Sequence, residues 1–243
     1  MKKRIKLLIY AAAACLIFTA SVSGGRICDY TYEGEENDVV VANRSAVKQV
    51  ALTFDDGPCK RYTPEILDIL NEYGIKATFF VVGKNAQQYP EIVLEEYNKG
   101  HEIGNHTYSH PNLRGLSAKR ISDEITKTQE ILSKITGKSP TLFRPPGGYL
   151  NNDIVDCIGQ SNCRPVLWSW RQDTKDWSNT PSEQIVNNIL GNLKDGDIIL
   201  FHDFHGGKSP TPDALRKLIP ILINDGYSFV TVSELIETKS ACP

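Results

Sequence analysis

Residues 50–82 read VALTFDDGPCKRYTPEILDILNEYGIKATFFVV, and this stretch decides the fold. It begins and ends with short apolar runs rich in β-branched residues, 50–54 and 77–82, which are typical of buried strands. Between them lies an amphipathic helical pattern that ends at Gly74, with Thr63 as the expected N-cap and Pro64 in the first turn. A strand, a helix and a second strand in this order predict two parallel strands joined by a crossover helix.

The same alternation continues outward along the chain. Further helices are expected at 91–98, 117–137, 153–158, 181–193 and 212–224, the second of them capped by Ser117. Further strands are expected at 102–104, 141–143, 165–170, 197–201 and 228–232. Seven strands with intervening helices predict an α/β fold, either a barrel or an open doubly wound sheet. We favour a distorted, incomplete (β/α) barrel of parallel strands that forms a single domain over residues 48–240.

The N-terminus has the pattern of an export segment. Basic residues between Lys2 and Lys6 precede an apolar run over 7–23 that ends in small residues. Residues 1–25 are therefore expected to be a secretory signal peptide or, alternatively, an uncleaved anchor. Residues 26–47 are expected to be a polar linker, with a short edge strand over 39–41. In both cases the domain is secreted or held at the cell surface, and an uncleaved N-terminus would be its only membrane contact.

Composition narrows the class of protein. Of the 243 residues, 40% are hydrophobic and 23% charged, which is ordinary for a globular domain. The formal net charge of −2 leaves no basic excess for nucleic acid, and we expect a monomer. Five cysteines follow residue 25, an odd number, and their spacing does not fix any pairing: Cys28, Cys59, Cys157, Cys163 and Cys242. None has the C-x-x-C spacing of a zinc or redox site.

Reactive side chains follow five of the expected strands. These side chains are grouped as Asp55-Asp56, His106 with His110, Arg144, Asp173 with Asp176, and His202-Asp203. In both candidate architectures, ligands bind at the carboxyl ends of parallel strands. The five groups are therefore expected to meet in one site.

The two histidines suggest a metal ion. His106 and His110 are four residues apart, so a helical turn would stack their imidazoles on one face. Asp56 is the natural third ligand, because two histidines and one carboxylate leave coordination positions open for water and substrate. Asp55 would then be free to act on the water. Adjacent carboxylates are unlike a glycosidase pair, which stands on both sides of the sugar.

Taken together, the motifs TFDDGP (53–58), HTYSH (106–110), RPP (144–146), DTKDW (173–177) and LFHD (200–203) resemble the five successive motifs of NodB-type polysaccharide deacetylases, carbohydrate esterase family 4. The family order is kept over about 150 residues, which makes the resemblance specific. The family fold is a distorted (β/α) barrel. The resemblance implies a divalent metal ion bound by Asp56, His106 and His110; we expect zinc, with Co²⁺, Ni²⁺ or Mn²⁺ as alternatives.

The resemblance also implies the remaining roles. Asp55 corresponds to the general base and His202 to the general acid. Arg144 corresponds to the arginine that orients Asp55 and keeps it ionised, and Asp176 to the carboxylate that raises the pKa of the histidine. Trp177 and Leu200 correspond to the pocket for the acetyl methyl group. A backbone N–H near Gly147 is expected to bind the oxyanion.

One motif departs from the family pattern. Gly147-Gly148 stands where many relatives have a bulky or aromatic residue after the Arg-Pro-Pro sequence. The flanking side chain of the groove is then either missing or supplied by Tyr149.

These residues predict a hydrolase that removes N-acetyl groups from a β-1,4-linked N-acetylhexosamine polymer. Peptidoglycan N-acetylglucosamine is the first candidate, because the export signal and short linker keep the domain near the cell wall. The expected partner is thus an N-acetylated cell-wall or extracellular polysaccharide. Chitin or chitooligosaccharide deacetylation and acetylxylan esterase activity are the alternatives. A wall-binding module with an inactive site is the non-enzyme alternative.

Five other residues are expected to take no part in the reaction. His101 is expected at the surface or in a capping role, and His205 in a mobile glycine-rich loop. Trp168 and Trp170 are expected to pack in the core, with a sugar-stacking wall as the other possibility. Cys59 is either a disulfide partner or a buried apolar residue.

Overall fold

The computed structural model describes residues 39–178, 180–204 and 206–239. The predictions for residues 1–25, for 26–38, for Cys28 and Cys242 and for the His205 loop lie outside the described residues. Within the described part of the chain, no helix is both long and apolar enough to cross a membrane.

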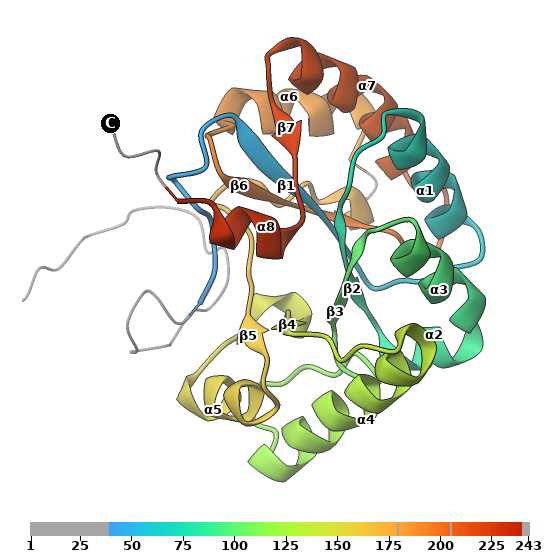
Figure 1. The fold of residues 1–243 in the computed structure, drawn as a ribbon, viewed down its shortest axis with the longest axis vertical. Coiled ribbons are helices and arrows are strands. Elements are labelled where there is room, and N and C mark those ends of the chain that lie inside the picture. Colours follow the sequence, from blue (N-terminus) through green and yellow to red (C-terminus); the bar gives the residue numbers. More distant parts are fainter. Residues whose placement is uncertain (1–38, 179, 205, 240–243) are drawn as a thin grey trace, which may run out of the picture.

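The strands form one parallel sheet that curves into a distorted barrel (Figure 1). In chain order they are β1 (Gln49–Asp55), β2 (Thr78–Val81), β3 (Glu102–Asn105), β4 (Leu142–Phe143), β5 (Arg164–Pro165), β6 (Asp197–His202) and β7 (Ser228–Phe229). Their order in the sheet is β5-β4-β3-β2-β1-β6, and β7 pairs with the first residues of β1. The (β/α) barrel prediction is confirmed.

The barrel is incomplete because β5 is only two residues long. Val166 N still donates to Phe143 O of β4 at 2.9 Å, and the chain then continues beside β6 from Ser169 to Asp173. Ser169 N donates to Ile198 O at 3.0 Å, and Leu200 N donates to Gln172 O at 2.9 Å. These bonds join the two ends of the sheet without a regular strand, so the predicted strand over 165–170 is replaced by an irregular closing segment.

Helices surround the sheet on its outside (Figure 1). They are α1 (Tyr62–Glu72), α2 (Gly83–Gln88), α3 (Pro90–Asn98), α4 (Ala118–Thr136), α5 (Asn152–Gln160), α6 (Ser182–Asn192), α7 (Thr211–Asn224) and α8 (Val232–Glu237). Ser117 caps α4 as expected, with its side chain accepting a bond from Arg120 N. The N-cap prediction for Thr63 is wrong: α1 begins at Tyr62, and the Thr63 hydroxyl accepts from Cys59 N and donates to Asp203 instead.

The C-terminal strand is shorter than the apolar run suggested. β7 ends at Phe229, and Thr231 starts α8 with a capping box in which Glu234 is the reciprocal partner. The Thr-x-x-Glu signature for a helix start was present in the sequence. It lies directly after a β-branched run, and the run alone had indicated a longer strand.

Residues 39–47, which fall in the predicted linker, pack on the barrel. Val40 pairs with Val166 and is 6% exposed, so the expected edge strand is reduced to an isolated bridge. The Asn43 side chain donates to Leu235 O, and Arg44 forms an ion pair with Asp197 at 2.6 Å. The packed part of the chain therefore begins before Lys48.

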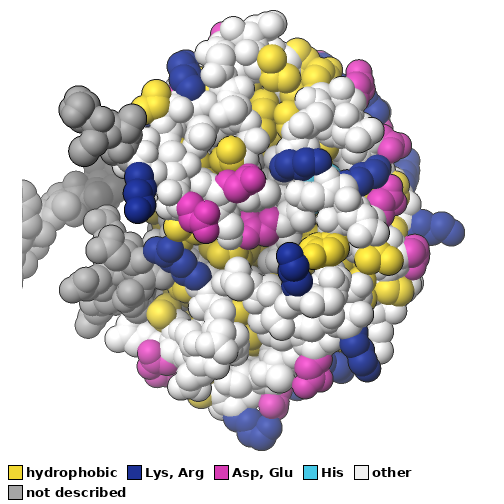
Figure 2. Space-filling model, in the orientation of Figure 1, with side chains coloured by type: hydrophobic (Ala, Val, Ile, Leu, Met, Phe, Trp, Pro, Cys, Tyr) yellow, Lys and Arg dark blue, Asp and Glu magenta, His cyan; other side chains and the backbone are white. Residues whose placement is uncertain are grey.

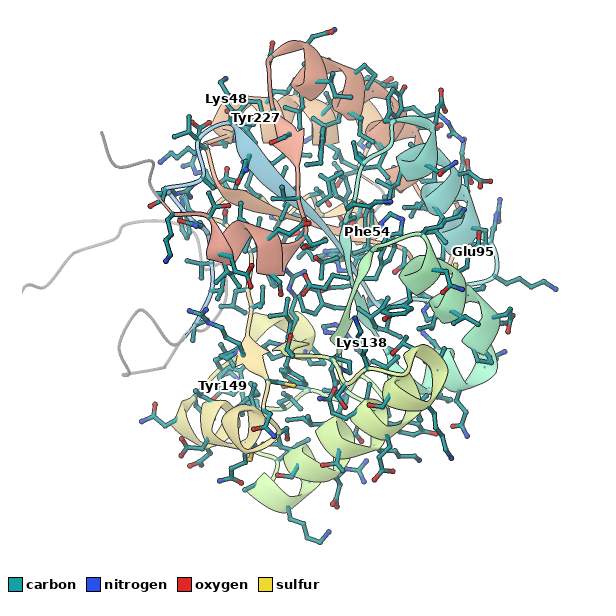
Figure 3. All side chains as sticks on the ribbon, viewed as in Figure 1. Lys48, Phe54, Glu95, Lys138, Tyr149 and Tyr227 are labelled. Atoms are coloured by element: carbon teal, nitrogen blue, oxygen red, sulfur yellow. The ribbon has the colours of Figure 1, made fainter. Side chains whose placement is uncertain are left out.

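Phe54 lies near the centre of the molecule, where side chains fill the space between strands and helices (Figure 3). Its ring stacks on Phe79 and Phe201 from the two neighbouring strands, with centroids 4.9 and 5.8 Å away. On the face of the molecule shown in Figure 2, positive and negative side chains are interspersed. A mixed surface of this kind does not favour binding of a polyanion there.

Candidate active site

A pocket of about 480 Å³ lies at the carboxyl ends of β1, β3 and β6. Nine residues expected in the site line it: Asp55, Asp56, His106, His110, Gly147, Asp173, Trp177, Leu200 and His202. Arg144 and Asp176 lie directly behind Asp55 and His202, to which they are bonded. The sequence motifs, although far apart in the chain, therefore meet at one end of the barrel.

Asp56, His106 and His110 converge on one point. The Nε2 atoms of His106 and His110 lie 3.3 and 3.0 Å from Asp56 Oδ1. These three residues form a possible metal-binding group, with one ligand atom from each within 4.8 Å of the others. The carboxylate and the two imidazoles suit a divalent transition metal.

The donor atoms also fit a cation electronically. His106 Nδ1 lies 2.6 Å from Arg144 O, a carbonyl that can only accept, so Nδ1 carries the proton. In a neutral ring, Nε2 then presents a lone pair to Asp56. The buried Asp56 Oδ1 has no hydrogen-bond partner among the described residues. Lone pairs that face one another repel unless a proton or a cation lies between them, so this donor set is suited to hold a cation.

Loops with unusual backbone geometry hold these ligands. Asp56 and His110 have φ angles of 76° and 53°, in the left-handed region that costs an ordinary residue about 1 kcal/mol or more. The segment from His106 to His110 is not helical, so the condition for helical stacking is not met, yet the two rings lie 5.1 Å apart with a tilt of 54°.

Glu124, on the buried face of α4, holds that turn. Its carboxylate accepts bonds from Tyr108 N and Ser109 N at 3.0 and 2.8 Å. The sequence analysis did not single out Glu124. A signal was present, because Glu124 falls in the apolar period of α4 between Ile121 and Ile125.

Asp55 is oriented by Arg144, whose side chain is fully buried. Arg144 Nη1 donates to Asp55 Oδ1 and to Thr53 Oγ1, both at 2.8 Å. Its other nitrogens bond to the carbonyls of Val166 and Leu167 in the closing segment. The guanidinium thus fixes one carboxylate oxygen of Asp55, while Oδ2 lies 3.8 Å from His106 Nε2.

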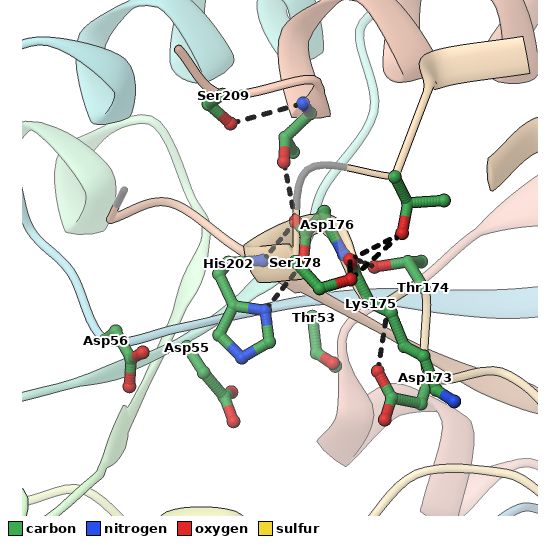
Figure 4. Close-up of polar contacts among 12 residues, drawn as sticks. Thr53, Asp55, Asp56, Asp173, Thr174, Lys175, Asp176, Ser178, His202 and Ser209 are labelled. Atoms are coloured by element: carbon green, nitrogen blue, oxygen red, sulfur yellow. Dashed lines mark hydrogen bonds and ion pairs between the residues drawn. The ribbon is translucent and has the colours of Figure 1, made fainter. Parts of the chain in front are cut away.

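His202 is paired with the buried carboxylate of Asp176 (Figure 4). The distance from Nδ1 to Asp176 Oδ1 is 2.7 Å, and Asp176 Oδ2 accepts from His202 N and Thr211 Oγ1. Burial alone would lower the pKa of His202, but the hydrogen bond and charge of Asp176 outweigh it and raise the pKa to about 9. The imidazole is therefore protonated at neutral pH and can donate a proton into the pocket.

The pocket walls combine apolar and polar groups. Leu200 is buried and Trp177 is 57% exposed, and both contribute apolar surface to the pocket. Gly147 has a φ of 65°, and a Cβ there would meet no atom within 4 Å, so conformation and not space calls for glycine. The remaining two wall residues are Trp168, which was expected in the core or as a sugar-stacking wall, and Lys175, which the sequence analysis did not single out.

Several residues do not lie where the sequence suggested. Tyr149 is absent from the lining of the pocket and stacks with Arg114 at 4.4 Å. His101 is buried, not at the surface, and accepts a bond from Ala77 N; burial and nearby lysines lower its pKa to about 4. Trp170 is 53% exposed and so does not pack in the core. The described cysteines, Cys59, Cys157 and Cys163, are buried free thiols, so of the two alternatives for Cys59 the buried apolar residue describes it.

Two acidic side chains lie buried outside the pocket. Burial raises the pKa of Asp203 to about 7, although the hydrogen bond from Thr63 opposes the shift. Burial also raises the pKa of Glu96 well above its usual value, and neither of its oxygens has a hydrogen-bond partner in the described part of the chain. Burial therefore favours the neutral form of both carboxyls.

Comparison with known proteins gives a consistent result. The polysaccharide deacetylase family model matches residues 42–166. A peptidoglycan-N-acetylglucosamine deacetylase of Bacillus cereus is 44% identical over 192 residues, which cover 79% of this chain and 90% of that protein.

Solved structures have the same fold. The crystal structure of the Bc1960 peptidoglycan N-acetylglucosamine deacetylase, in complex with 4-naphthalen-1-yl-N-oxidanyl-benzamide, has a TM-score of 0.79 and 40% identity, covering 84% of this chain and 94% of that one. A family 4 acetyl xylan esterase from Clostridium thermocellum, in complex with a cobalt ion, has a TM-score of 0.72 and 37% identity, with coverages of 78% and 90%.

Proposed function

Because the chain belongs to the polysaccharide deacetylase family, carbohydrate esterase family 4, we propose that it removes N-acetyl groups from N-acetylglucosamine residues of peptidoglycan. The observation that carries this function is the arrangement of two charged pairs, Asp55 with Arg144 and His202 with Asp176, around one ligand triad. This arrangement separates a base from an acid within one pocket, as hydrolysis of an amide requires.

A divalent metal ion bound by Asp56, His106 and His110 would supply Lewis-acid chemistry, lowering the pKa of water and polarising the acetamide carbonyl. We propose zinc as this ion, since a carboxylate and two imidazoles suit it; Co²⁺, Ni²⁺ and Mn²⁺ are the alternatives. The orphaned Asp56 Oδ1 and the proton on His106 Nδ1 support this assignment.

Asp55 is the proposed general base. Arg144 holds Oδ1, so Oδ2 is left to take the proton of the attacking water. Arg144 also keeps a negative charge on Asp55 favourable inside the barrel. As the tetrahedral intermediate forms, a backbone N–H near Gly147 would donate to its oxyanion.

His202 is the proposed general acid. Because Asp176 raises its pKa to about 9, His202 carries the proton that the departing amine needs. Figure 4 shows Asp55, Asp56 and His202 on the same side of the strands that carry them. Leu200 and Trp177 would receive the acetyl methyl group, which orients the amide between acid and base. The products are acetate and a free amino sugar.

The location of the protein follows from this substrate. A deacetylase of the cell wall acts outside the cytoplasm, in keeping with the predicted export segment over residues 1–25, either cleaved or retained as an anchor. We propose that the domain of about 48–240, extended by the packed residues 39–47, acts as a monomer.

Acetate release separates the candidate substrates. The protein would be incubated with purified peptidoglycan, N-acetylated chitooligosaccharide and acetylxylan, and mass spectrometry of muropeptides would locate the free amine. Peptidoglycan is expected to give the highest kcat/KM. Faster release from acetylxylan would favour the esterase alternative, and release from none would favour a binding module. Asp55→Asn should abolish release, whereas Asp153→Asn, on the exposed side of α5, should not.

A further inference from the structure

Asp203 lies directly after β6, beside His202, and is only 1% exposed. Its carboxylate Oδ2 accepts a hydrogen bond from Thr63 Oγ1, in the first turn of α1, at 2.6 Å. Its backbone N–H donates to Asp55 O at the end of β1, at 3.2 Å. This one residue therefore ties together β6, β1 and α1 at the base of the pocket.

The carboxylate of Asp203 lies against the backbone of Gly57. A Cβ atom on Gly57 would stand 2.0 Å from Asp203 Oδ2 and 2.3 Å from both Cγ and Oδ1. Gly57 is not among the residues with positive φ, so its backbone does not call for glycine. The close approach to Asp203 is what excludes a side chain at this position.

Gly57 immediately follows Asp56, the proposed metal ligand. The loop is held from its other side, because Val82 N donates to Gly57 O and Asn85 Nδ2 donates to Asp56 O, at 2.9 and 2.7 Å. Asp56 itself has a φ of 76°, an unfavourable conformation that persists only where the surroundings enforce it. Without the Asp203 carboxylate, the loop could move toward the space behind it and relax.

We propose that Asp203 is a positioning residue, which holds the proposed metal ligand Asp56 in place by packing against Gly57 and bonding Thr63. It touches neither the substrate nor the metal. The proposal rests on the proposed metal site, and its consequence is that the Asp203 carboxyl sets the affinity for the ion. Mutation of a group that orients a metal ligand typically weakens metal binding about 10- to 100-fold.

Asp197 provides a matched control, because it is another aspartate of β6 that is 1% exposed and hydrogen-bonded. It begins the strand, at the end of the barrel away from the pocket. The dissociation constant for Zn²⁺ or Co²⁺ would be measured by calorimetric titration on folded protein, with circular dichroism as the check on folding. Asp203→Ala should weaken binding about 10- to 100-fold, and Asp197→Ala by less than about threefold. Equal effects, or unchanged affinity in Asp203→Ala, would overturn the proposal.

The contact with Gly57 gives a sharper second test. Gly57→Ala alone forces the Cβ into the carboxylate and should weaken metal binding. In the double variant Gly57→Ala/Asp203→Ala, the Cβ enters the vacated space, so binding should be tighter than in Gly57→Ala alone. Effects that simply multiply would show that the two groups do not act through their contact.

Two conservative variants of Thr63 test the same contact if Asp203→Ala does not fold. Thr63→Ser keeps the hydroxyl that bonds Asp203, whereas Thr63→Val removes it at nearly constant size. Thr63→Val should weaken metal binding at least threefold relative to Thr63→Ser, and equal affinities would contradict the positioning role. If the wild-type chain binds no divalent metal, the metal site and this proposal both fall. Normal metal binding without acetate release would contradict the proposed function alone.

Discussion

The carboxylate of Asp176 lies 2.7 Å from Nδ1 of His202, and both groups are shielded from solvent on the floor of the pocket. Asp176 also accepts bonds from the backbone N–H of His202 and from Thr211 Oγ1. The carboxylate is therefore fixed on two sides and cannot turn away from the imidazole. Its charge keeps a proton on a buried histidine that would otherwise lose it.

This pairing predicts the alkaline limit of activity. A general acid works only while it is protonated, so activity should fall as pH rises through about 9, the pKa of His202. Asp176→Asn removes the charge that most raises the pKa, while burial still lowers the pKa and the charges of Asp55 and Asp56 still raise it. The alkaline limb of the kcat profile should therefore move to lower pH by about one unit or more, with a loss of about 5-fold or more at pH 9. Thr211→Val, which keeps the carboxylate, should move the limb less; an unmoved limb in Asp176→Asn would rule out His202 as the acid.

The buried pair of Arg144 and Asp55 predicts a large effect on stability. Arg144→Met leaves Asp55 buried without its counter-charge, which should lower the free energy of unfolding by about 3–5 kcal/mol. Adding Asp55→Asn should restore part of the loss, because the uncompensated charge is then removed. Urea denaturation of the two single variants and the double variant measures this coupling. Additive losses would mean that the pair does not interact as the geometry indicates.

The residues of the candidate site were predicted from the sequence more accurately than the contacts that hold them in position. Asp55, His106 and His202 each follow a buried strand, and parallel strands end at the same edge, so their meeting could be derived. The three predicted metal ligands do lie together as a possible metal-binding group, although a strained turn and not a helix brings His110 back to Asp56.

The errors share a physical cause. Thr63, Tyr149 and His101 were assigned from neighbours in the chain, but contacts distant in sequence decide their environments. Likewise, the roles of Glu124 and Asp203 depend on loops that lie 15 or more residues away, and local patterns do not report such loops. The ends of strands can be predicted from hydrophobic periodicity, whereas the residues that hold the following loops in place cannot.

Removing the metal ion should abolish activity, and removing one of its proposed ligands should reduce the metal content. Treatment with a chelator should abolish acetate release, and Zn²⁺ or Co²⁺ should restore it. His106→Ala removes one ligand and should reduce metal content by at least about 10-fold. The matched control is His101→Ala, because His101 is also buried but lies before β3, outside the pocket. Elemental analysis of both purified variants checks the ligand set, and full metal content in His106→Ala would contradict it.

Mutation of Glu124 should weaken metal binding, although Glu124 does not line the pocket. Its carboxylate accepts three bonds from the turn that carries His110, from Tyr108 N, Ser109 N and Ser109 Oγ. Glu124→Gln keeps the size of the side chain but places an amide, which donates, where one oxygen now accepts. The turn should loosen, and because His110 is 43% exposed, little else restrains its ring. We expect metal affinity to fall about 10-fold while the far-ultraviolet circular dichroism stays unchanged.

Glu130→Gln, on the exposed face of the same helix, should leave the affinity at its wild-type value. Equal affinities in the two variants would show that the turn keeps its shape without Glu124.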